Sequence, residues 1–208
     1  MQTAVTPKRG APASSDIHRL VLASTSPYRR ALLERLGIPF AVANPEIPEE
    51  RRAGEAPEAM AGRLAEAKAL AVAGRFPGSL IVGSDQVAVC DGKILGKPMT
   101  HDKAVRQLRA LSAREALFFT AVCVHNTRER RSGLRVVPCR VTFRRLDDAV
   151  IESYLAKEQP YDCAGSAKSE GLGIALMAKI DSEDPSALIG LPLIALVDLL
   201  REQGLNVL

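Results

Sequence analysis

Short apolar runs alternate along the chain with segments whose apolar residues recur at helical spacing. Strands are predicted at 19–23, 79–83, 86–90, 93–95, 116–125 and 133–143. Helices, with their capping residues, are predicted at 27–36, 57–73, 100–111, 147–158 and 192–203. Because strands and helices alternate without an internal repeat, the pattern predicts the α/β class.

Turn residues add detail to these elements. Asp91-Gly92 predicts a type I′ turn that joins 86–90 and 93–95 as a hairpin. Pro138 cannot donate a ladder hydrogen bond, so its strand is expected to have an edge or a bulge there. The polar, proline-rich segment 44–57 and the Gly/Ser-rich segment 160–173 are expected to be loops.

Length and composition indicate a globular protein. The chain has 208 residues, of which 47% are hydrophobic and 25% charged, enough apolar material for one sizeable core. Its longest apolar stretch, 188–200, contains Gly190, Pro192 and Asp198 and is too short to span a membrane. Residues 1–17 lack the apolar stretch of a secretory signal and are predicted to be a disordered tail, followed by a single domain at 18–208.

The four cysteines favour reduced thiols and a cytoplasmic location. They lie far apart, form no CxxC motif, and three of them fall inside apolar runs; they are Cys90, Cys123, Cys139 and Cys163. This spacing argues against a zinc site and against a disulfide framework. The three histidines also lack metal-ligand spacing, and no Ser/His/Asp grouping indicates a hydrolytic triad.

The segment from Ser24 to Arg30 is a candidate anion site. A strand that opens into a helix N-terminus presents free backbone N–H groups and the positive end of the helix dipole. Hydroxyls and two arginines strengthen this interpretation. A plain helix cap with surface arginines remains the alternative.

Asp85 and Lys97 form a second candidate. Asp85 follows an apolar strand directly, at the kind of strand end where α/β proteins bind ligands, so it can hold a metal or accept a proton from water. The hairpin can return Lys97 to the same strand end. The alternatives are an aspartate that caps a turn and a solvated lysine.

Two further features can belong to a site. Lys68 shares a helical stripe with apolar residues, so it either extends along the core surface to solvent or serves a site. The loop 161–171 is rich in small and polar residues, as ligand-binding loops are, although a flexible connector has the same composition.

These motifs together resemble those of the Maf family of nucleoside triphosphate pyrophosphatases. The matching segments, in order, are Leu22-Ala23-Ser24-Thr25-Ser26-Pro27, Arg63-Leu64-Ala65 with Lys68-Ala69, Ser84-Asp85-Gln86 with Gly96-Lys97-Pro98, and Ala164-Gly165-Ser166 with Glu170-Gly171. They extend over nearly the whole chain after the tail. Ser-Pro-Tyr-Arg-Arg, Ser-Asp-Gln and Lys-Ser-Glu-Gly resemble the subgroup that acts on 7-methyl-GTP rather than the dTTP/UTP subgroup.

The resemblance implies a fold and a reaction. The expected fold is an elongated mixed β-sheet with flanking helices and two lobes around a cleft, as in the inosine triphosphate pyrophosphatases. The expected reaction is hydrolysis of a nucleoside triphosphate, 7-methyl-GTP, to the monophosphate and pyrophosphate with Mg²⁺ or Mn²⁺. A tetra-anionic triphosphate needs several cations, and a metal with a carboxylate eases the formation of hydroxide from water.

The resemblance also implies roles for individual residues. Asp85 is the expected proton acceptor; the expected phosphate ligands are Ser24, Arg29, Lys68 and Lys97. The base is expected to contact Tyr28, Gln86 and Glu170, and the metal Asp85, Glu46 and Glu49. The chain departs from the family pattern at Ile47-Pro48-Glu49, where one carboxylate is lost, at Ala121 in place of glycine, and at Ala167 in place of an aromatic residue.

Other functions remain open from the sequence alone. A pI of about 9.0 and the basic residues Arg128, Arg130, Arg131, Arg144 and Arg145 suggest a nucleic-acid-binding module. Only 4% of residues are aromatic, so no stable nucleic-acid complex is expected. A pyrophosphatase for dTTP, UTP or other nucleotides is the second alternative. The expected partner is the nucleotide, without a membrane, and a homodimer is left open.

Overall fold

Residues 19–208 are described by a computed structural model, and the tail predicted at 1–17 lies outside them. Within this range, seven strands form one mixed sheet in the order β2-β1-β3-β5-β6-β7, with β4 paired to β3. The strands are β1 (Arg19–Ala23), β2 (Phe40–Ala43), β3 (Ser79–Cys90), β4 (Lys93–Leu95), β5 (Glu115–Asn126), β6 (Arg131–Phe143) and β7 (Met177–Ser182). β1 is parallel to β2 and β3, and the remaining pairs are antiparallel.

Five α-helices flank this sheet, which confirms the predicted α/β class. They are α1 (Pro27–Glu34), α2 (Pro57–Ala73), α3 (His101–Leu111), α4 (Asp148–Glu158) and α5 (Leu193–Glu202). The predicted caps of α3 and α4 accept backbone hydrogen bonds: Thr100 from Lys103 and Asp147 from Val150. Three 3₁₀ helices occur in the later loops: η1 (Ala164–Ser166), η2 (Leu172–Leu176) and η3 (Ala187–Ile189).

Three features of the sheet differ from the prediction. The segments 79–83 and 86–90 form one continuous strand, β3, so Asp85 lies inside a strand and not at its end. β2 and β7 were not predicted, because β2 has only four residues and β7 carries polar residues on an exposed edge. β7 pairs with β6 only from Cys139 onward, so Pro138 lies where β6 has one partner, as predicted.

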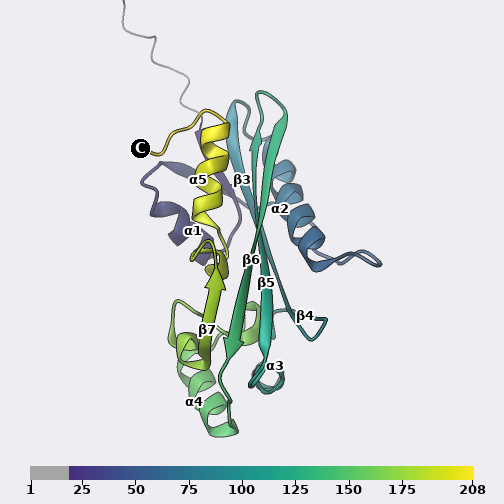
Figure 1. Cartoon of the computed structure of the whole chain (residues 1–208). Helices are drawn as coiled ribbons and strands as arrows, with labels where there is room; N and C mark the ends of the chain where they lie inside the picture. The colour runs from purple at the N-terminus through teal and green to yellow at the C-terminus, as the bar shows by residue number, and fades with distance from the viewer. Residues whose placement is uncertain (1–18) are drawn as a thin grey trace, which may run out of the picture.

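Alternate residues of the strands face different helices. Even-numbered residues of β3, such as Leu80 and Val82, pack with α1 and α5, whereas Ile81 packs with α2 on the other face. Figure 1 shows α1 and α5 on one side of the sheet and α2 on the other. Two-residue periodicity in the strands therefore builds two apolar layers around one sheet.

The far end of the long strands carries a separate apolar cluster. Ala88, Phe118 and Val141 pack there with α3 and α4, which lie away from α1, α2 and α5 (Figure 1). The fold is therefore elongated and has two lobes that share β3, β5 and β6. In residues 19–208, no helix is long and apolar enough to cross a membrane.

Candidate active site

A gap in the sheet lies between the two lobes. β1 pairs with β3 as far as Gly83, and β4 begins to pair at Ala88, so residues 84–87 have β5 as their one neighbour. β1 is parallel to β3 and β4 is antiparallel, so the ends of both strands face this gap. Ser24 then leads into α1, and Gly96 leads away from β4, which opens a cavity of about 620 Å³.

This cavity, called the central cleft below, confirms the predicted cleft between two lobes. It is lined by all ten residues predicted for the site: Ser24, Tyr28, Arg29, Glu46, Glu49, Lys68, Asp85, Gln86, Lys97 and Glu170. They come from the β1–α1 turn, α1, the loop 44–56, α2, β3, the segment after β4 and the loop 160–173. Segments far apart in the sequence are therefore brought together around residues 84–87 of β3, which pair on one side only.

Lys68 and Asp85 form the buried centre of the cleft. Lys68 Nζ lies 2.6 Å from Asp85 Oδ1 and 2.6 Å from Glu49 Oε1. Lys68 is 5% exposed and Asp85 7%. The ammonium group of Lys68 thus pairs with two carboxylates inside the cleft. Its side chain does not extend along the core surface to solvent.

Close packing of α2 on β3 brings this pair together. Gly83 has no side chain where the helix crosses the strand, and a Cβ there would lie 2.1 Å from the carbonyl oxygen of Ala65. A larger residue would push the helix away from the sheet. Lys68, one turn further along α2, therefore reaches Asp85 because residue 83 is glycine.

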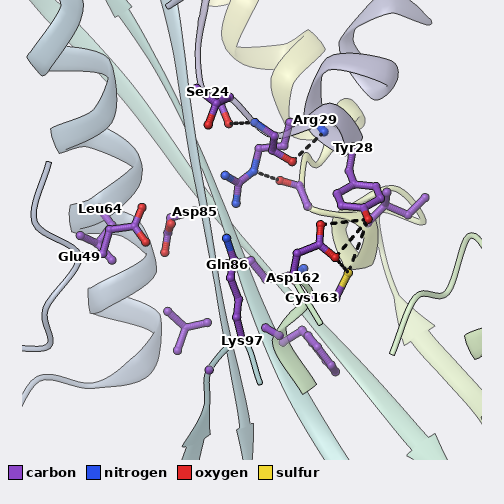
Figure 2. Close-up of a pocket in the computed structure, with 18 of the residues that line it drawn as sticks. Ser24, Tyr28, Arg29, Glu49, Leu64, Asp85, Gln86, Lys97, Asp162 and Cys163 are labelled. Atoms are coloured by element: carbon purple, nitrogen blue, oxygen red, sulfur yellow. Dashed lines mark hydrogen bonds between the residues drawn. The ribbon is translucent and has the colours of Figure 1, made fainter. Parts of the chain in front are cut away.

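Ser24, in the turn before α1, and Arg29, in the first turn of α1, lie on the same side of the cleft near Asp85 (Figure 2). Arg29 Nε donates to the carbonyl oxygen of Gly190 at 2.9 Å, and Ser24 Oγ accepts from the backbone N–H of Ser26. Burial lowers the pKa of Arg29, while the charges of Asp85 and Glu49 act to raise it. Ser24, Arg29, Lys68 and Asp85, together with Glu49 and Lys97, are called the sheet end of the cleft.

Glu49 and Lys97 complete the charges of the sheet end. Lys97 is exposed and points into the cleft from the segment that follows β4. Burial acts to raise the pKa of Glu49, but the hydrogen bond and charge of Lys68, with the charges of Lys97 and Arg29, hold it below its usual value. Glu49 is therefore a carboxylate near neutral pH.

Gln86 points to the opposite face of β3 from Asp85, because neighbouring strand residues alternate in direction. Its Nε2 donates to Thr120 Oγ1 and to the carbonyl oxygens of Ala187 and Leu188, at 2.9–3.1 Å. Ser84 Oγ donates to Gly190 on the same face. Gln86 thus fixes the segment 187–190 as one wall of the cleft, a role that the sequence motif alone did not indicate.

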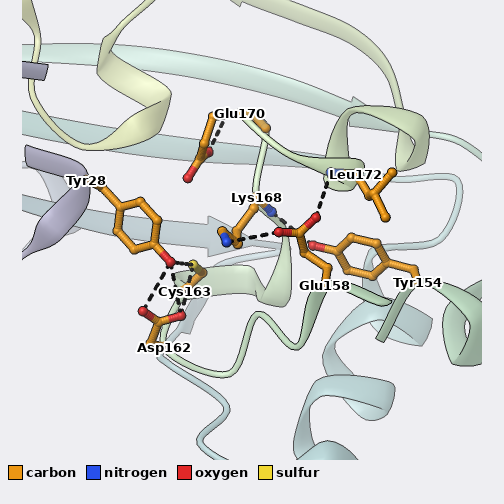
Figure 3. A network of polar contacts seen from close by, with 9 residues as sticks. Tyr28, Tyr154, Glu158, Asp162, Cys163, Lys168, Glu170 and Leu172 are labelled. Carbon is orange, nitrogen blue, oxygen red and sulfur yellow. Dashed lines mark hydrogen bonds and ion pairs between the residues drawn. The ribbon is translucent and has the colours of Figure 1, made fainter. Parts of the chain in front are cut away.

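The other end of the cleft is formed by the loop 160–173 together with Tyr28 (Figure 3). The Tyr28 hydroxyl donates to Asp162 Oδ2 at 3.2 Å. Lys168 Nζ lies 5.3 Å from the centre of the Tyr28 ring and 2.9 Å from Glu158 Oε1. Tyr28, Asp162, Lys168 and Glu170 are called the loop end. Asp162 and Lys168 lie in the candidate loop 161–171, but the sequence assigned neither of them a role.

Comparison with known proteins shows the family. The pattern of the family described as Maf-like protein matches residues 19–203. The chain belongs to this family. Proteins named 7-methyl-GTP pyrophosphatase from Methylobacillus flagellatus, Cupriavidus pinatubonensis and Pseudomonas aeruginosa are 58%, 56% and 50% identical to it. The matches cover 91%, 92% and 90% of this chain and 98%, 96% and 98% of those proteins.

The three predicted metal ligands of this Maf-like chain do not form one group. Among residues 19–208, no three His, Cys, Asp or Glu side chains are arranged to hold a metal ion. Glu46 instead accepts a hydrogen bond from Asn44, while Asp85 and Glu49 both contact Lys68. Two carboxylates fit a Mg²⁺ ion that takes its other ligands from a triphosphate and water.

The basic residues that suggested nucleic-acid binding are divided between the two ends of β6. Arg128, Arg130 and Arg131 lie at the β5–β6 turn, where Arg131 pairs with Glu129 at 3.0 Å. Arg144 and Arg145 follow the other end of this 13-residue strand, about 40 Å away at the usual rise per residue. The Maf-like fold thus divides the predicted basic stretch into two small groups.

Proposed function

We propose that the chain hydrolyses 7-methyl-GTP between its α- and β-phosphates, giving 7-methyl-GMP and pyrophosphate. The observation that carries the proposal is that one cleft collects all ten residues that the Maf resemblance assigns to this reaction. The identity of 50–58% to proteins named 7-methyl-GTP pyrophosphatase supports the choice of substrate. The free thiols of all four cysteines fit a cytoplasmic enzyme.

The sheet end binds the triphosphate in this proposal. Ser24 and the first turn of α1 line the cleft, and the positive end of the helix dipole there favours an anion. Arg29 Nε is engaged by Gly190, which leaves the other guanidinium nitrogens for phosphate oxygens. Lys97, exposed on the opposite rim, and Lys68 supply further positive charge.

Asp85 accepts the proton of the attacking water. Lys68 holds Asp85 Oδ1 at 2.6 Å and so fixes the direction of the carboxylate. The water oxygen attacks the α-phosphorus, its proton passes to Asp85, and pyrophosphate leaves with the electrons of the broken phosphoanhydride bond. A positioned carboxylate base contributes a factor of about 10²–10⁴ to such a step.

A divalent cation, Mg²⁺ or Mn²⁺, supplies positive charge that offsets the charge of the triphosphate. Asp85 and Glu49 are the carboxylates that would hold it, since both line the cleft and both lie within 2.6 Å of Lys68 Nζ. Glu46 lines the same cleft but is engaged with Asn44.

The loop end selects the base. The Watson–Crick edge of guanine presents two adjacent donors, N1–H and the exocyclic amine, and the carboxylate of Glu170 can accept both. Uracil and thymine present carbonyl oxygens there, which a carboxylate repels. Methylation at N7 gives guanine a positive charge, which suits the ring of Tyr28 and the charge of Glu170. Gln86 shapes the wall between the two ends.

The bond that breaks tests this proposal. Unmodified enzyme is incubated with 7-methyl-GTP and Mg²⁺, and the products are separated by ion-exchange chromatography. We expect equal amounts of 7-methyl-GMP and pyrophosphate, and loss of both products when EDTA is added. Formation of 7-methyl-GDP and inorganic phosphate would show that another bond is cleaved and would contradict the proposal.

A further inference from the structure

The two ends of the central cleft differ in charge. The sheet end holds three cations, Arg29, Lys68 and Lys97, near two carboxylates. At the loop end, Asp162 and Glu170 line the cleft, and Lys168 is already paired with Glu158. A ligand that is anionic at one end and cationic at the other matches this distribution.

The ring of Tyr28 is already in contact with a cation. Lys168 Nζ lies 5.3 Å from the ring centre, within the range of a cation–π contact. Glu158 Oε1 lies 2.9 Å from Lys168 Nζ and holds Lys168 near the ring (Figure 3). Glu158 itself is fixed, because its other oxygen accepts the backbone N–H of Leu172 at 2.8 Å. The surroundings of Tyr28 therefore favour positive charge against its face.

The hydroxyl of Tyr28 adds a second, independent feature. It donates to both carboxylate oxygens of Asp162, at 3.2 and 3.5 Å. Burial, with the neighbouring Cys163 and Asp162, raises the pKa of Tyr28 to about 12, so the phenol keeps the proton that it donates. A phenol that donates to an anion is polarised, and its ring becomes more negative on both faces. A more negative ring attracts a cation more strongly.

From these contacts we infer that Asp162 is a specificity residue that acts through Tyr28 and increases the preference of the cleft for a nucleotide with a positively charged base. The inference rests on the proposed function and extends it to a residue with no assigned role. Asp162 is a positioning residue in this account, because its effect passes through the phenol and needs no contact with the base. Asp162 is exposed, so water screens its charge and the effect is modest.

Binding of the product nucleotides tests the inference without turnover. Calorimetry at mildly acidic pH, where 7-methylguanine keeps its N1 proton and its charge, compares 7-methyl-GMP, GMP and 7-methyl-7-deaza-GMP. The last has the methyl group without the charge. Asp162→Asn keeps the shape of the side chain and a hydrogen-bond acceptor. We expect it to weaken the binding of 7-methyl-GMP about threefold and to leave the affinities of the two nucleotides with neutral bases unchanged. Asp181→Asn, on the exposed strand β7, is the control and should change none of them.

A double-mutant cycle tests the route through Tyr28. In the Tyr28→Phe background, which lacks the hydroxyl, Asp162→Asn should have no further effect on 7-methyl-GMP. A remaining threefold effect would show that Asp162 acts directly on the base and would overturn the inference. The inference would also be overturned if Asp162→Asn weakened the binding of all three nucleotides equally or left the affinity for 7-methyl-GMP unchanged. The same holds if the unmodified protein did not bind 7-methyl-GMP. The proposed function fails by a different result, the absence of pyrophosphate from 7-methyl-GTP.

Discussion

The two ends of the central cleft are built in different ways. At the sheet end, Lys68 and Asp85 are almost completely buried, and both belong to regular elements packed against each other. At the loop end, Asp162 and Glu170 are exposed on a loop, and Asp162 accepts a hydrogen bond from Tyr28 of the other lobe. The reacting groups are therefore held by the core, while the groups assigned to base selection can vary with little effect on the fold.

The largest expected effect is at the sheet end. Asp85→Asn should lower pyrophosphate release by a factor of roughly 10² or more, because an amide cannot accept the proton of water. The fold should remain, since the amide keeps the shape of the side chain and one acceptor for Lys68. Steady-state rates and circular dichroism of the same preparation measure the two effects. Near-normal turnover in a folded Asp85→Asn protein would remove Asp85 from the mechanism.

A pair of glycine substitutions compares the rigidity of the two ends. Gly83→Ala should lower the free energy of unfolding by about 3 kcal/mol, because the new Cβ meets the backbone of Ala65. Gly171→Ala at the loop end should cost less, about 1 kcal/mol, because the nearest neighbours of its Cβ are side-chain atoms of Glu158, which can move aside only by weakening its bonds to Lys168 and Leu172. Urea unfolding measures both values. If the two variants lose the same free energy of unfolding, the sheet end is not more rigid than the loop end.

Glu170→Gln probes base selection at the loop end. We expect the ratio of kcat/KM for 7-methyl-GTP over UTP to fall about tenfold, because the amide accepts less strongly from guanine and no longer repels the uracil carbonyls. The melting temperature should stay within about 1 °C, since Glu170 is exposed and, among residues 19–208, its side chain hydrogen-bonds only Ser169. An unchanged ratio would show that another residue distinguishes the bases.

The smallest expected effect concerns the loop that carries Glu49. Glu55 accepts two hydrogen bonds from Arg63 on α2, and these chiefly lower its pKa from 4.5 to about 2. A carboxyl group whose pKa is lower in the folded than in the unfolded chain stabilises the fold at pH values above its unfolded-state pKa. This stabilisation is lost as the pH falls through the folded-state pKa. The stability difference between the parent and Glu55→Gln should therefore be constant above about pH 5 and shrink between pH 4.5 and pH 2. If the stability difference between the parent and Glu55→Gln does not change with pH, the ion pair between Glu55 and Arg63 does not stabilise the fold.

The sequence predicts the regular elements better than the site. Hydrophobic periodicity and capping residues located the five α-helices of residues 19–208, because those signals are local. The position of Asp85 inside β3 depends on which strands pair on each side, and this pairing is set by distant segments. The two partners of Lys68 and the contact of Asp162 with Tyr28, 134 residues away, likewise exist only in the folded chain.

The substrate preference of the unmodified protein tests the central claim most directly. The measurement is kcat/KM for 7-methyl-GTP and for UTP, both read as pyrophosphate release with Mg²⁺ at the same pH. Because Glu170 pairs with the guanine edge and repels pyrimidine carbonyls, and Tyr28 favours a cationic base, 7-methyl-GTP should be preferred by about 10²-fold. Equal values for the two nucleotides, or a higher value for UTP, would contradict the assignment of base recognition to the loop end.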